Sequence, residues 1–165
     1  MAIFHTIVVA VDFSDISKHV VETARELARL HQARLHVVHA IGDPFSSMYA
    51  VETTGLDLPD VLRQWTDAAQ KRLADLVGEQ PPDGDLLTTA VLPGSPAHAI
   101  VRYAADHQAD LIVVGSHGRG TVSRLLLGSV AERVLHHAGR SVLVVSHHAR
   151  VREPLDIGVA TTVSA

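Results

Sequence analysis

The sequence predicts an α/β domain built on a doubly wound, five-stranded parallel sheet with helices on both faces. Short apolar runs alternate along the chain with longer segments whose apolar residues recur at helical spacing. The short runs are rich in valine and bounded by turn residues, which is typical of parallel strands covered on both faces. Right-handed connections between such strands give 3-2-1-4-5 as the simplest strand order.

Five short runs are the candidate strands. They are the segments Thr6 to Val11, Arg34 to Ala40, Leu87 to Leu92, Leu111 to Val114 and Ser141 to Val145.

Four intervening segments are the candidate helices. In the first, the apolar residues with helical spacing are Val20, Ala24, Leu27 and Ala28. In the second, they are Val61, Leu62, Trp65, Ala69, Leu73 and Leu76. In the third, Ser95 is the expected N-cap and Pro96 takes the first helical position. The fourth begins near Ser129, and the residues on its apolar face are Val130, Val134, Leu135 and Ala138.

We predict a single domain over residues 1–146 and a C-terminal tail over residues 147–165. The threonines and valines of the tail are compatible with an extra strand or with no regular structure, and the sequence does not decide between them. The connection from Ile41 to Leu58 is longer than an ordinary link in a compact domain, and we interpret it as a candidate flap.

Composition and charge exclude several classes of function. The 14 basic and 18 acidic side chains give a formal net charge of -4, so no basic field favours nucleic-acid binding. The chain has no cysteine, which excludes disulfides, thiolate zinc sites and a cysteine nucleophile. Its N-terminal residues lack the pattern of a signal peptide, and no apolar run approaches the roughly 18 residues of a membrane span. We therefore expect a soluble, cytoplasmic protein that is not membrane-embedded and binds no nucleic acid.

A glycine-rich stretch, GSHGRGTVSRLLLGS, connects the fourth predicted strand to the last predicted helix. In the predicted strand order, the first and fourth strands are neighbours and the chain reverses direction between them. A ligand crevice is expected at the carboxyl ends of these strands, which lead into Asp12 and Gly115. The glycine-rich stretch therefore begins at the predicted crevice.

A phosphate needs converging N–H groups and a backbone that it can approach closely. Gly115, Gly118 and Gly128 lack Cβ atoms, and the amides of Ser129 and Val130 would lie at a helix N-terminus. The Ser129 hydroxyl could also bind a phosphate oxygen or a phosphate-bound metal ion. The alternative, that the glycines only turn the chain, is equally compatible with the residues alone.

The spacing of these glycines differs from the familiar phosphate-binding motifs. The GxxxxGK[ST] pattern is absent, because the two lysines of the chain, Lys18 and Lys71, are remote from the stretch. GxGxxG is absent because its intervals differ. The observed pattern is Gly-x2-Gly-x9-Gly-Ser.

This pattern resembles the universal stress protein family, whose ATP-binding members have Gly-x2-Gly-x9-Gly-Ser/Thr. The resemblance is carried by GSHGRGTVSRLLLGSVAERVLHHAGRSVLVV together with ADLIVVG and VAVDFSD, and it covers roughly residues 4 to 146. It implies an adenine nucleotide alpha hydrolase-like fold with a five-stranded parallel sheet. It also implies a homodimer or higher homo-oligomer formed through the last strand. Ser141 departs from the family, which often has a proline before this strand.

The resemblance also implies a nucleotide site for ATP with Mg²⁺ or Mn²⁺. Asp12 would lie against the nucleoside, and the backbone of Ala40, or of His39, would contact adenine. Gly115 would lie beside the ribose. The residues expected around the triphosphate are Gly118, Gly128, Ser129 and Val130.

Three polar residues of the glycine-rich stretch have two interpretations each. His117 is suited to acid–base chemistry, but a packing or capping role is favoured because no carboxylate lies nearby in the sequence. Arg119 and Arg124 are suited to phosphate contacts, or are solvated loop residues. We include His117 and Arg124 among the predicted nucleotide-binding residues.

Metal binding is expected only through the nucleotide. Asp12 and Ser129 are the candidate ligands of a phosphate-bound ion, whereas the alternative role of Asp12 is to cap the first helix. The 12 histidines do not have the spacing of a zinc site. His36 and His39, for example, would face opposite sides of one strand.

The predicted function is that of an ATP-binding, nucleotide-dependent regulatory protein of the stress response. The sequence contains no clear general base and no lysine near the phosphates, so any ATP hydrolysis is expected to be weak. A regulated client protein such as a transporter is a candidate partner. The alternatives are a nucleotide-free partner-binding module, a nucleotidylyltransferase, which would need an HxGH motif that this chain lacks, and a flavin-binding subunit, which would be yellow.

Overall fold

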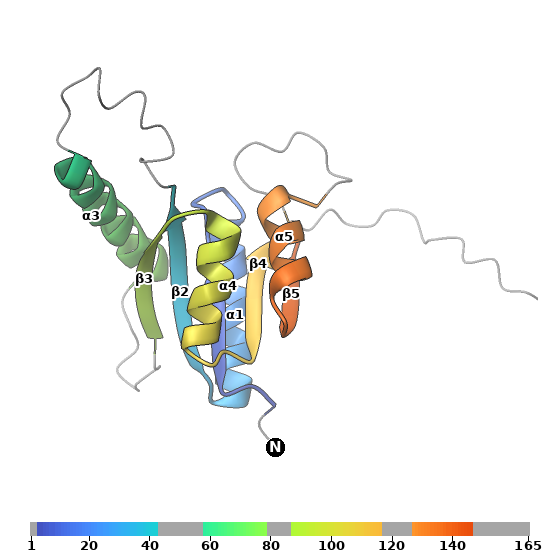
Figure 1. Cartoon of the computed structure of the whole chain (residues 1–165). Coiled ribbons are helices and arrows are strands. Elements are labelled where there is room, and N and C mark those ends of the chain that lie inside the picture. The colour runs from blue at the N-terminus through green and yellow to red at the C-terminus, as the bar shows by residue number, and fades with distance from the viewer. Residues whose placement is uncertain (1–2, 43–57, 79–86, 117–126, 147–165) are drawn as a thin grey trace, which may run out of the picture.

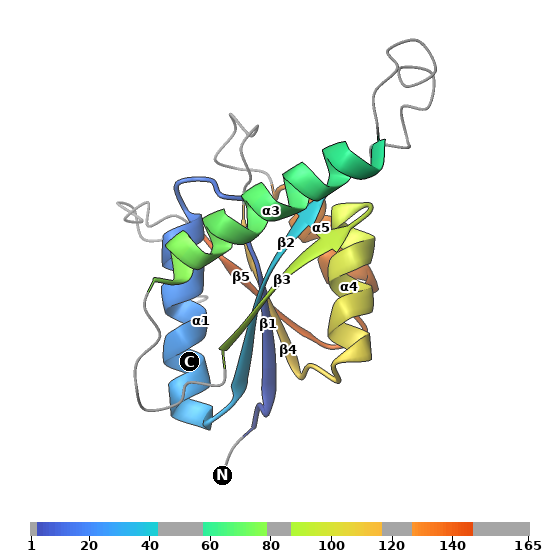
Figure 2. The same ribbon diagram turned by 90° about the vertical axis from the view of Figure 1, so that its left-hand side faces the viewer.

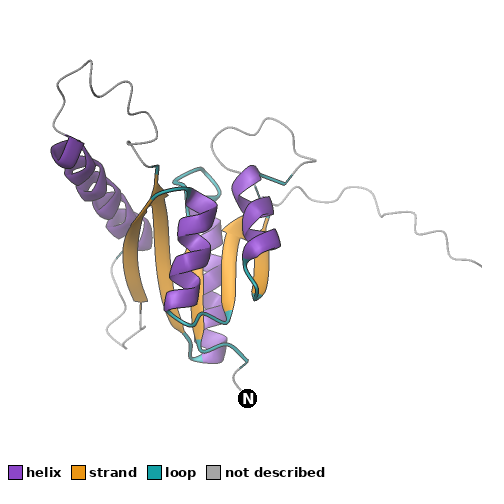
Figure 3. Ribbon diagram, in the orientation of Figure 1, coloured by secondary structure: helices purple, strands orange, loops and turns teal. Residues whose placement is uncertain are grey.

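The computed structural model of the chain describes residues 3–42, 58–78, 87–116 and 127–146 (Figure 1). Strands and helices alternate along these residues, as the sequence predicts (Figure 3). The elements in chain order are β1 (Thr6–Ala10), α1 (Ser17–His31), β2 (Arg34–Ile41), α3 (Leu58–Val77), β3 (Leu87–Pro93), α4 (Pro96–Asp106), β4 (Leu111–Gly115), α5 (Ser129–His137) and β5 (Ser141–Val145).

The five strands form one parallel sheet in the order β3-β2-β1-β4-β5. This confirms the predicted strand order, and β1 and β4 are neighbours at the point where the chain reverses direction. Individual strand ends differ from the prediction by a residue. β1 ends at Ala10 instead of Val11, although the Val11 amide still donates to the Val38 carbonyl at 2.9 Å.

Helices cover both faces of the sheet (Figure 2). One apolar core lies between the sheet and the pair α1 and α3, and a second lies between the sheet and the pair α4 and α5. Successive strand residues contribute to opposite cores: Val9 belongs to the first and Val8 to the second, and both are 0% exposed. Burial on both faces explains why the strands are apolar at consecutive positions.

The helices follow the predicted periodicity, with three local corrections. In α5, the buried residues are Ala131 and Val134, whereas Val130 and Leu135 are 37% and 50% exposed. Trp65 in α3 is 49% exposed and lies outside the core. Apolar spacing identified both helices but did not distinguish the buried residues of each turn from their exposed apolar neighbours.

The third correction concerns the start of α4. Ser95 occupies the N-cap position and Pro96 begins the helix, as predicted, but the Ser95 side chain makes no capping hydrogen bond. The Ser95 carbonyl accepts the first helical hydrogen bond, from the Ala99 amide at 2.9 Å. The residue is therefore placed as expected without making the expected side-chain contact.

A glutamine with left-handed backbone stands at the end of α1, as its C-cap, and another follows His107, the C-cap of α4. Gln32 has φ 53° and Gln108 has φ 51°. In each case the next amide reaches back over the turn, from Ala33 to the Ala28 carbonyl at 2.9 Å and from Ala109 to the Ala104 carbonyl at 2.8 Å. This pattern of bonds satisfies carbonyls at a helix C-terminus, and its left-handed position is one that glycine usually occupies.

Within the described ranges, no helix has both the length and the apolar character needed to cross a membrane. The flap was predicted over Ile41 to Leu58, but Ile41 is the last residue of β2 and Leu58 is the first residue of α3. The rest of that connection, residues 43–57, and the predicted tail, residues 147–165, lie outside the described residues.

Candidate functional site

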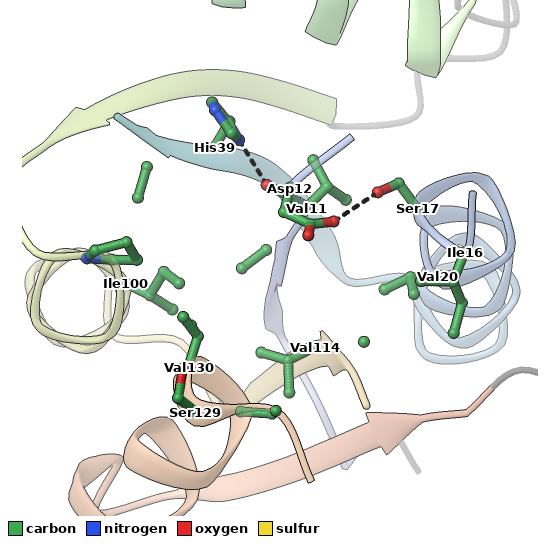
Figure 4. Close-up of a pocket in the computed structure, with 16 residues that line it drawn as sticks. Val11, Asp12, Ile16, Ser17, Val20, His39, Ile100, Val114, Ser129 and Val130 are labelled. Atoms are coloured by element: carbon green, nitrogen blue, oxygen red, sulfur yellow. Dashed lines mark hydrogen bonds between the residues drawn. The ribbon is translucent and has the colours of Figure 1, made fainter. Parts of the chain in front are cut away.

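A pocket of about 450 Å³ opens at the carboxyl ends of β1 and β4, where the strand order predicts a ligand crevice (Figure 4). Three helices, α1, α4 and α5, contribute residues near their N-termini to it, and the end of β2 forms a further wall. The residues that line the pocket are Ala10, Val11, Asp12, Ile16, Ser17, Val20, His39, Ala40, Pro96, Ile100, Val114, Gly115, Gly128, Ser129, Val130 and Ala131.

Asp12 follows β1 and organises the turn that leads into α1. Its Oδ1 atom accepts hydrogen bonds from the Ser14 amide at 3.0 Å and the Ser14 hydroxyl at 2.5 Å. The Ser17 hydroxyl donates to the same atom at 3.3 Å (Figure 4). These bonds form a turn closed by an aspartate side chain. The N-cap of α1 is Ile16, so the alternative in which Asp12 caps this helix is wrong.

Phe13, the central residue of this turn, has a left-handed backbone with φ 61°. For a residue with a Cβ atom, this conformation costs about 1–2 kcal/mol. The Phe13 ring contacts the His39 ring, with centroids 4.2 Å apart, and the Arg72 guanidinium carbon lies 4.1 Å from the Phe13 centroid. The strained turn is thus held by groups from β2 and α3.

His39, near the end of β2, forms part of the pocket wall. Its Nδ1 atom lies 2.7 Å from the Val11 carbonyl oxygen (Figure 4). Because a carbonyl oxygen only accepts, Nδ1 carries the hydrogen in this contact. Val11 is therefore held by β2 on two sides, since its amide also donates to Val38.

His36 faces the other side of β2, as predicted from the odd spacing between the two histidines. Its Nδ1 atom lies 3.0 Å from the Tyr103 hydroxyl of α4, and its side chain is buried. Burial, followed by the nearby His107 and Arg34, lowers the pKa of His36 from the ordinary value of 6.5. His36 and His39 thus belong to opposite layers of the domain and do not approach one another to bind a metal ion.

The opposite wall of the pocket is made by the start of α5. The Gly128 amide donates to the Ser116 carbonyl at 2.7 Å, and the Gly128 carbonyl accepts from the Glu132 amide at 2.9 Å. The amides of Ser129, Val130 and Ala131 precede this first helical bond and have no acceptor within the helix. They lie at the positive end of the helix dipole, where an anion is stabilised.

The glycines of the motif that the structure describes do not have a backbone that requires glycine. Gly128 has φ -65° and ψ 146°, an extended conformation open to any residue. Gly115 is the last residue of β4 and is not among the glycines with positive φ, which in the described ranges are Gly78, Gly94 and Gly139. A positive φ therefore does not explain glycine at positions 115 and 128, both of which line the pocket.

The structure brings six of the nine predicted site residues to one pocket. These residues are Asp12, Ala40, Gly115, Gly128, Ser129 and Val130. The other three, His117, Gly118 and Arg124, lie outside the described residues, as does Arg119. Ligand contacts of all nine residues stay a prediction.

The apolar part of the wall, which includes Ile16, Val20, Pro96 and Ile100, was not predicted from the sequence. In the sequence these residues belong to helical patterns and cannot be told from core residues. One signal was available: in a doubly wound sheet, the first turn of a helix that follows a strand lies at the carboxyl edge, where ligands bind.

No group of three or more histidine, aspartate or glutamate side chains in the described part of the chain is arranged to hold a metal ion. Asp12 and Ser129 line the same pocket but come from different elements, the loop after β1 and the start of α5. Carboxylate and hydroxyl oxygens suit Mg²⁺ or Mn²⁺ that is also held by phosphates. An ion bound together with a nucleotide is compatible with this donor set and stays a prediction.

Residues 3–146 match the model of the universal stress protein family, and the chain belongs to this family. It is 33% identical over 144 residues to a universal stress protein of Methanocaldococcus jannaschii, covering 87% of this chain and 82% of that protein. It is 35% identical over 150 residues to one of Thermus aquaticus, covering 86% of this chain and 98% of that protein.

Solved structures of the same family share the fold. The universal stress protein UspA of Lactobacillus plantarum has 30% identity and a TM-score of 0.68, with 88% of this chain and 99% of that chain covered. A universal stress protein in complex with cAMP has 30% identity and a TM-score of 0.55, covering 86% and 96% of the two chains. One from Archaeoglobus fulgidus in complex with dAMP has 26% identity and a TM-score of 0.55, covering 86% and 98%.

Proposed function

We propose that this chain binds ATP in the pocket between β1 and β4 and acts as a nucleotide-dependent regulator of the stress response. The observation that carries the proposal is the composition of the pocket walls. An aspartate and apolar side chains form one part, and helix amides with no acceptor within the helix, beside a glycine, form another. A nucleotide has the matching parts: a nucleoside with hydroxyl groups and an apolar base, and an anionic phosphate chain.

The nucleoside is expected at the Asp12 wall. A pocket of about 450 Å³ is in the range of small-molecule sites and is large enough for an adenine nucleotide. Val11, Ala40 and Ile100 offer apolar contacts to a base, and Asp12 offers a carboxylate to ribose hydroxyls. The relatives that hold cAMP and dAMP support an adenine nucleotide as the ligand class.

The phosphates are expected at the α5 wall. Three amides at the start of α5 and the Ser129 hydroxyl provide donors there, and Gly128 leaves room for close approach. Glu132 lies in the first turn of α5 but is exposed and does not line the pocket. Its charge therefore faces solvent and not the expected phosphates.

Binding without rapid hydrolysis is the activity we propose. Phosphoryl transfer needs a positioned base or water-orienting group and a positive clamp on the developing charge. Lys18 and Lys71 lie on α1 and α3 and do not line the pocket. An ATP turnover well below one per second, measured as released phosphate, is the expected result.

The ligand is identified by releasing it from the purified native chain by heat and analysing the supernatant by mass spectrometry. Titration calorimetry with ATP, with and without Mg²⁺, then gives the affinity. Gly118→Ala and Gly128→Ala are expected to weaken ATP binding about 10-fold or more, because a Cβ atom would meet the phosphates. Gly42→Ala is a matched control, because no atom lies within 4 Å of its added Cβ and its φ is not positive.

Two results would contradict the proposal. A wild-type protein that carries no nucleotide and has no affinity for ATP at millimolar concentration would favour the alternative, a nucleotide-free partner-binding module. Unchanged affinity in both glycine variants would leave ATP binding intact and show that the phosphate wall is assigned wrongly.

A cytoplasmic homodimer formed through β5 is part of the same proposal. β5 is the last strand of the sheet and pairs only with β4 among the described strands. Val142, Leu143 and Val144 in its centre are only half-buried. An exposed apolar edge of this kind is suited to pairing with a second copy. Light scattering on the purified chain over a range of concentrations is expected to give twice the monomer mass.

A further inference from the structure

The turn after β1 contains a non-glycine residue with left-handed backbone directly beside the pocket. Phe13 has φ 61° and lies between Asp12 and Ser14. Its conformation returns the Ser14 amide to Asp12 Oδ1, where the two atoms are 3.0 Å apart. The Phe13 backbone therefore fixes the direction in which the Asp12 carboxylate points.

The Phe13 side chain joins this turn to two other elements. Its ring centroid lies 4.2 Å from that of His39, with the planes tilted by 41°, and 4.1 Å from the Arg72 guanidinium carbon. His39 belongs to β2 and Arg72 to α3. One ring thus connects the loop after β1, the end of β2 and α3.

Phe13 acts from behind the wall and not from within the pocket. Asp12 and His39 are lining residues, whereas Phe13 is not among them. His39 is held in two directions, by its Nδ1 contact with the Val11 carbonyl at 2.7 Å and by the Phe13 ring. The contacts of Phe13 therefore reach two wall residues at the end where the nucleoside is expected.

We propose that Phe13 is a positioning residue for the nucleoside part of the ligand. Its left-handed backbone aims Asp12, and its ring, held by Arg72, orients His39. This inference rests on the proposed nucleotide function and deepens it, because it names the residues that set recognition at the nucleoside end. It also makes α3 part of the site without any α3 side chain lining the pocket.

The test uses the full chain and two ligands, ATP and adenosine, each titrated by calorimetry. Phe13→Gly keeps the left-handed turn without a Cβ cost but removes the ring. Because the ring acts at the nucleoside end, this variant is expected to weaken ATP and adenosine by the same factor, about 5- to 10-fold. Phe13→Tyr keeps the ring and is expected to bind both ligands as the wild type does.

Arg72→Gln tests the contact between α3 and the Phe13 ring. Loss of the cation over Phe13 is expected to weaken both ligands by about 2- to 5-fold. Lys71→Gln removes the same charge from the neighbouring exposed position of α3 and is expected to leave both affinities unchanged. Ser129→Ala provides the opposite signature, with weaker ATP binding and unchanged adenosine binding.

The outcomes separate this inference from the proposed function. Wild-type affinity of Phe13→Gly for adenosine, or a loss confined to ATP, would overturn the positioning role and leave ATP binding intact. A wild-type chain that binds neither ligand overturns both. Thermal unfolding of each variant is measured in parallel, and if Phe13→Gly does not fold, equal affinities of Arg72→Gln and Lys71→Gln would overturn the inference.

Discussion

The two polar walls of the pocket are built by different means. The Asp12 wall depends on side chains: a carboxylate holds its own turn, and the rings of Phe13 and His39 contact one another at a tilt. The α5 wall depends on backbone, because its donors are main-chain amides and Gly128 contributes only the absence of a side chain. Phe13, which lies behind the first wall, has a strained conformation, whereas Gly128 has an ordinary extended backbone.

Because of this difference, we expect the two walls to differ in how strongly they discriminate between ligands. Backbone amides at a helix N-terminus bind an anion of almost any identity. A carboxylate and a ring held in fixed directions depend on the shape and hydrogen-bonding groups of the ligand. We therefore expect the α5 wall to supply much of the affinity for phosphates and the Asp12 wall to select the nucleoside.

The largest effect is expected from Gly128→Val. Its extended backbone accepts valine without strain, so the fold should survive, but the side chain would occupy the space beside the α5 amides. ATP affinity is expected to fall about 100-fold, or about 2.7 kcal/mol. Adenosine affinity, measured in the same titration series, should change little. An equal loss for both ligands would show that the two walls do not divide the ligand between them.

A smaller effect, in the opposite pattern, is expected from Asp12→Asn. The amide keeps an oxygen that can accept the Ser14 bonds but loses the charge, so the turn should persist. Loss of a charged hydrogen-bond acceptor costs from about 1.5 kcal/mol, so affinity is expected to fall about 10-fold or more. Both ATP and adenosine should weaken. If only Mg²⁺-ATP weakened, Asp12 would act on the metal ion and not on the nucleoside.

Mild acid is expected to act on the layer away from both walls. The pKa of His36 is lowered mainly by burial, so the unfolded chain binds a proton more readily than the folded chain. The free energy of unfolding should therefore fall as the pH drops below 6.5 and level off below the folded pKa. Urea unfolding between pH 5 and 7.5 measures this slope. His36→Gln is expected to reduce the slope, and an unchanged slope would assign it to other groups.

The smallest effect is expected from Gln32→Gly at the end of α1. Gln32 has φ 53°, which glycine adopts without the cost of a Cβ atom, so stability should rise by about 1 kcal/mol. Thermal unfolding measures the gain, and nucleotide affinity should not change. Gln108→Gly, with φ 51°, is the matched variant at the end of α4. A loss of stability in both would show that their side chains contribute more than the backbone costs.

These glutamines and Phe13 share a left-handed backbone, and the contrast between them sharpens the comparison of the walls. At a helix end the conformation is a frequent solution, and glycine should improve it. Beside Asp12, the same replacement should cost binding. We therefore expect strain to be linked to function at Phe13, where the position of a pocket-lining side chain depends on it, and not at the two glutamines.

The fold followed from the sequence because its signals are local and repeated. The alternation of strands and helices was evident from runs such as Thr6 to Val11, and it led directly to the strand order and to the position of the crevice. Five residues of the pocket, Asp12, Gly115, Gly128, Ser129 and Val130, could be located because glycine spacing and strand ends mark the carboxyl edge of a parallel sheet, whereas Ala40 was placed by the family resemblance. The residues that can contact a ligand at such an edge occupy a few sequence positions, directly after the strands.

Other features could not be predicted because they depend on packing between distant segments. Arg72 and Phe13 are 59 positions apart, and nothing in either neighbourhood indicates their contact. Trp65 and Leu135 are exposed although their spacing fits an apolar helix face. Helical spacing alone does not show which positions on a helix other segments cover. The left-handed conformation of Phe13 is unusual for an aromatic residue, so propensity favours a different backbone there.

The bonds of Val11 have a consequence for the order in which the pocket forms. Its amide and carbonyl are both held by β2, through the Val38 carbonyl and His39 Nδ1. At Val11, the pocket wall is therefore a continuation of the β1–β2 ladder and not a separate loop. During folding it can be completed only after the first strand–helix–strand unit has closed, and in hydrogen exchange the Val11 amide should open with the central sheet.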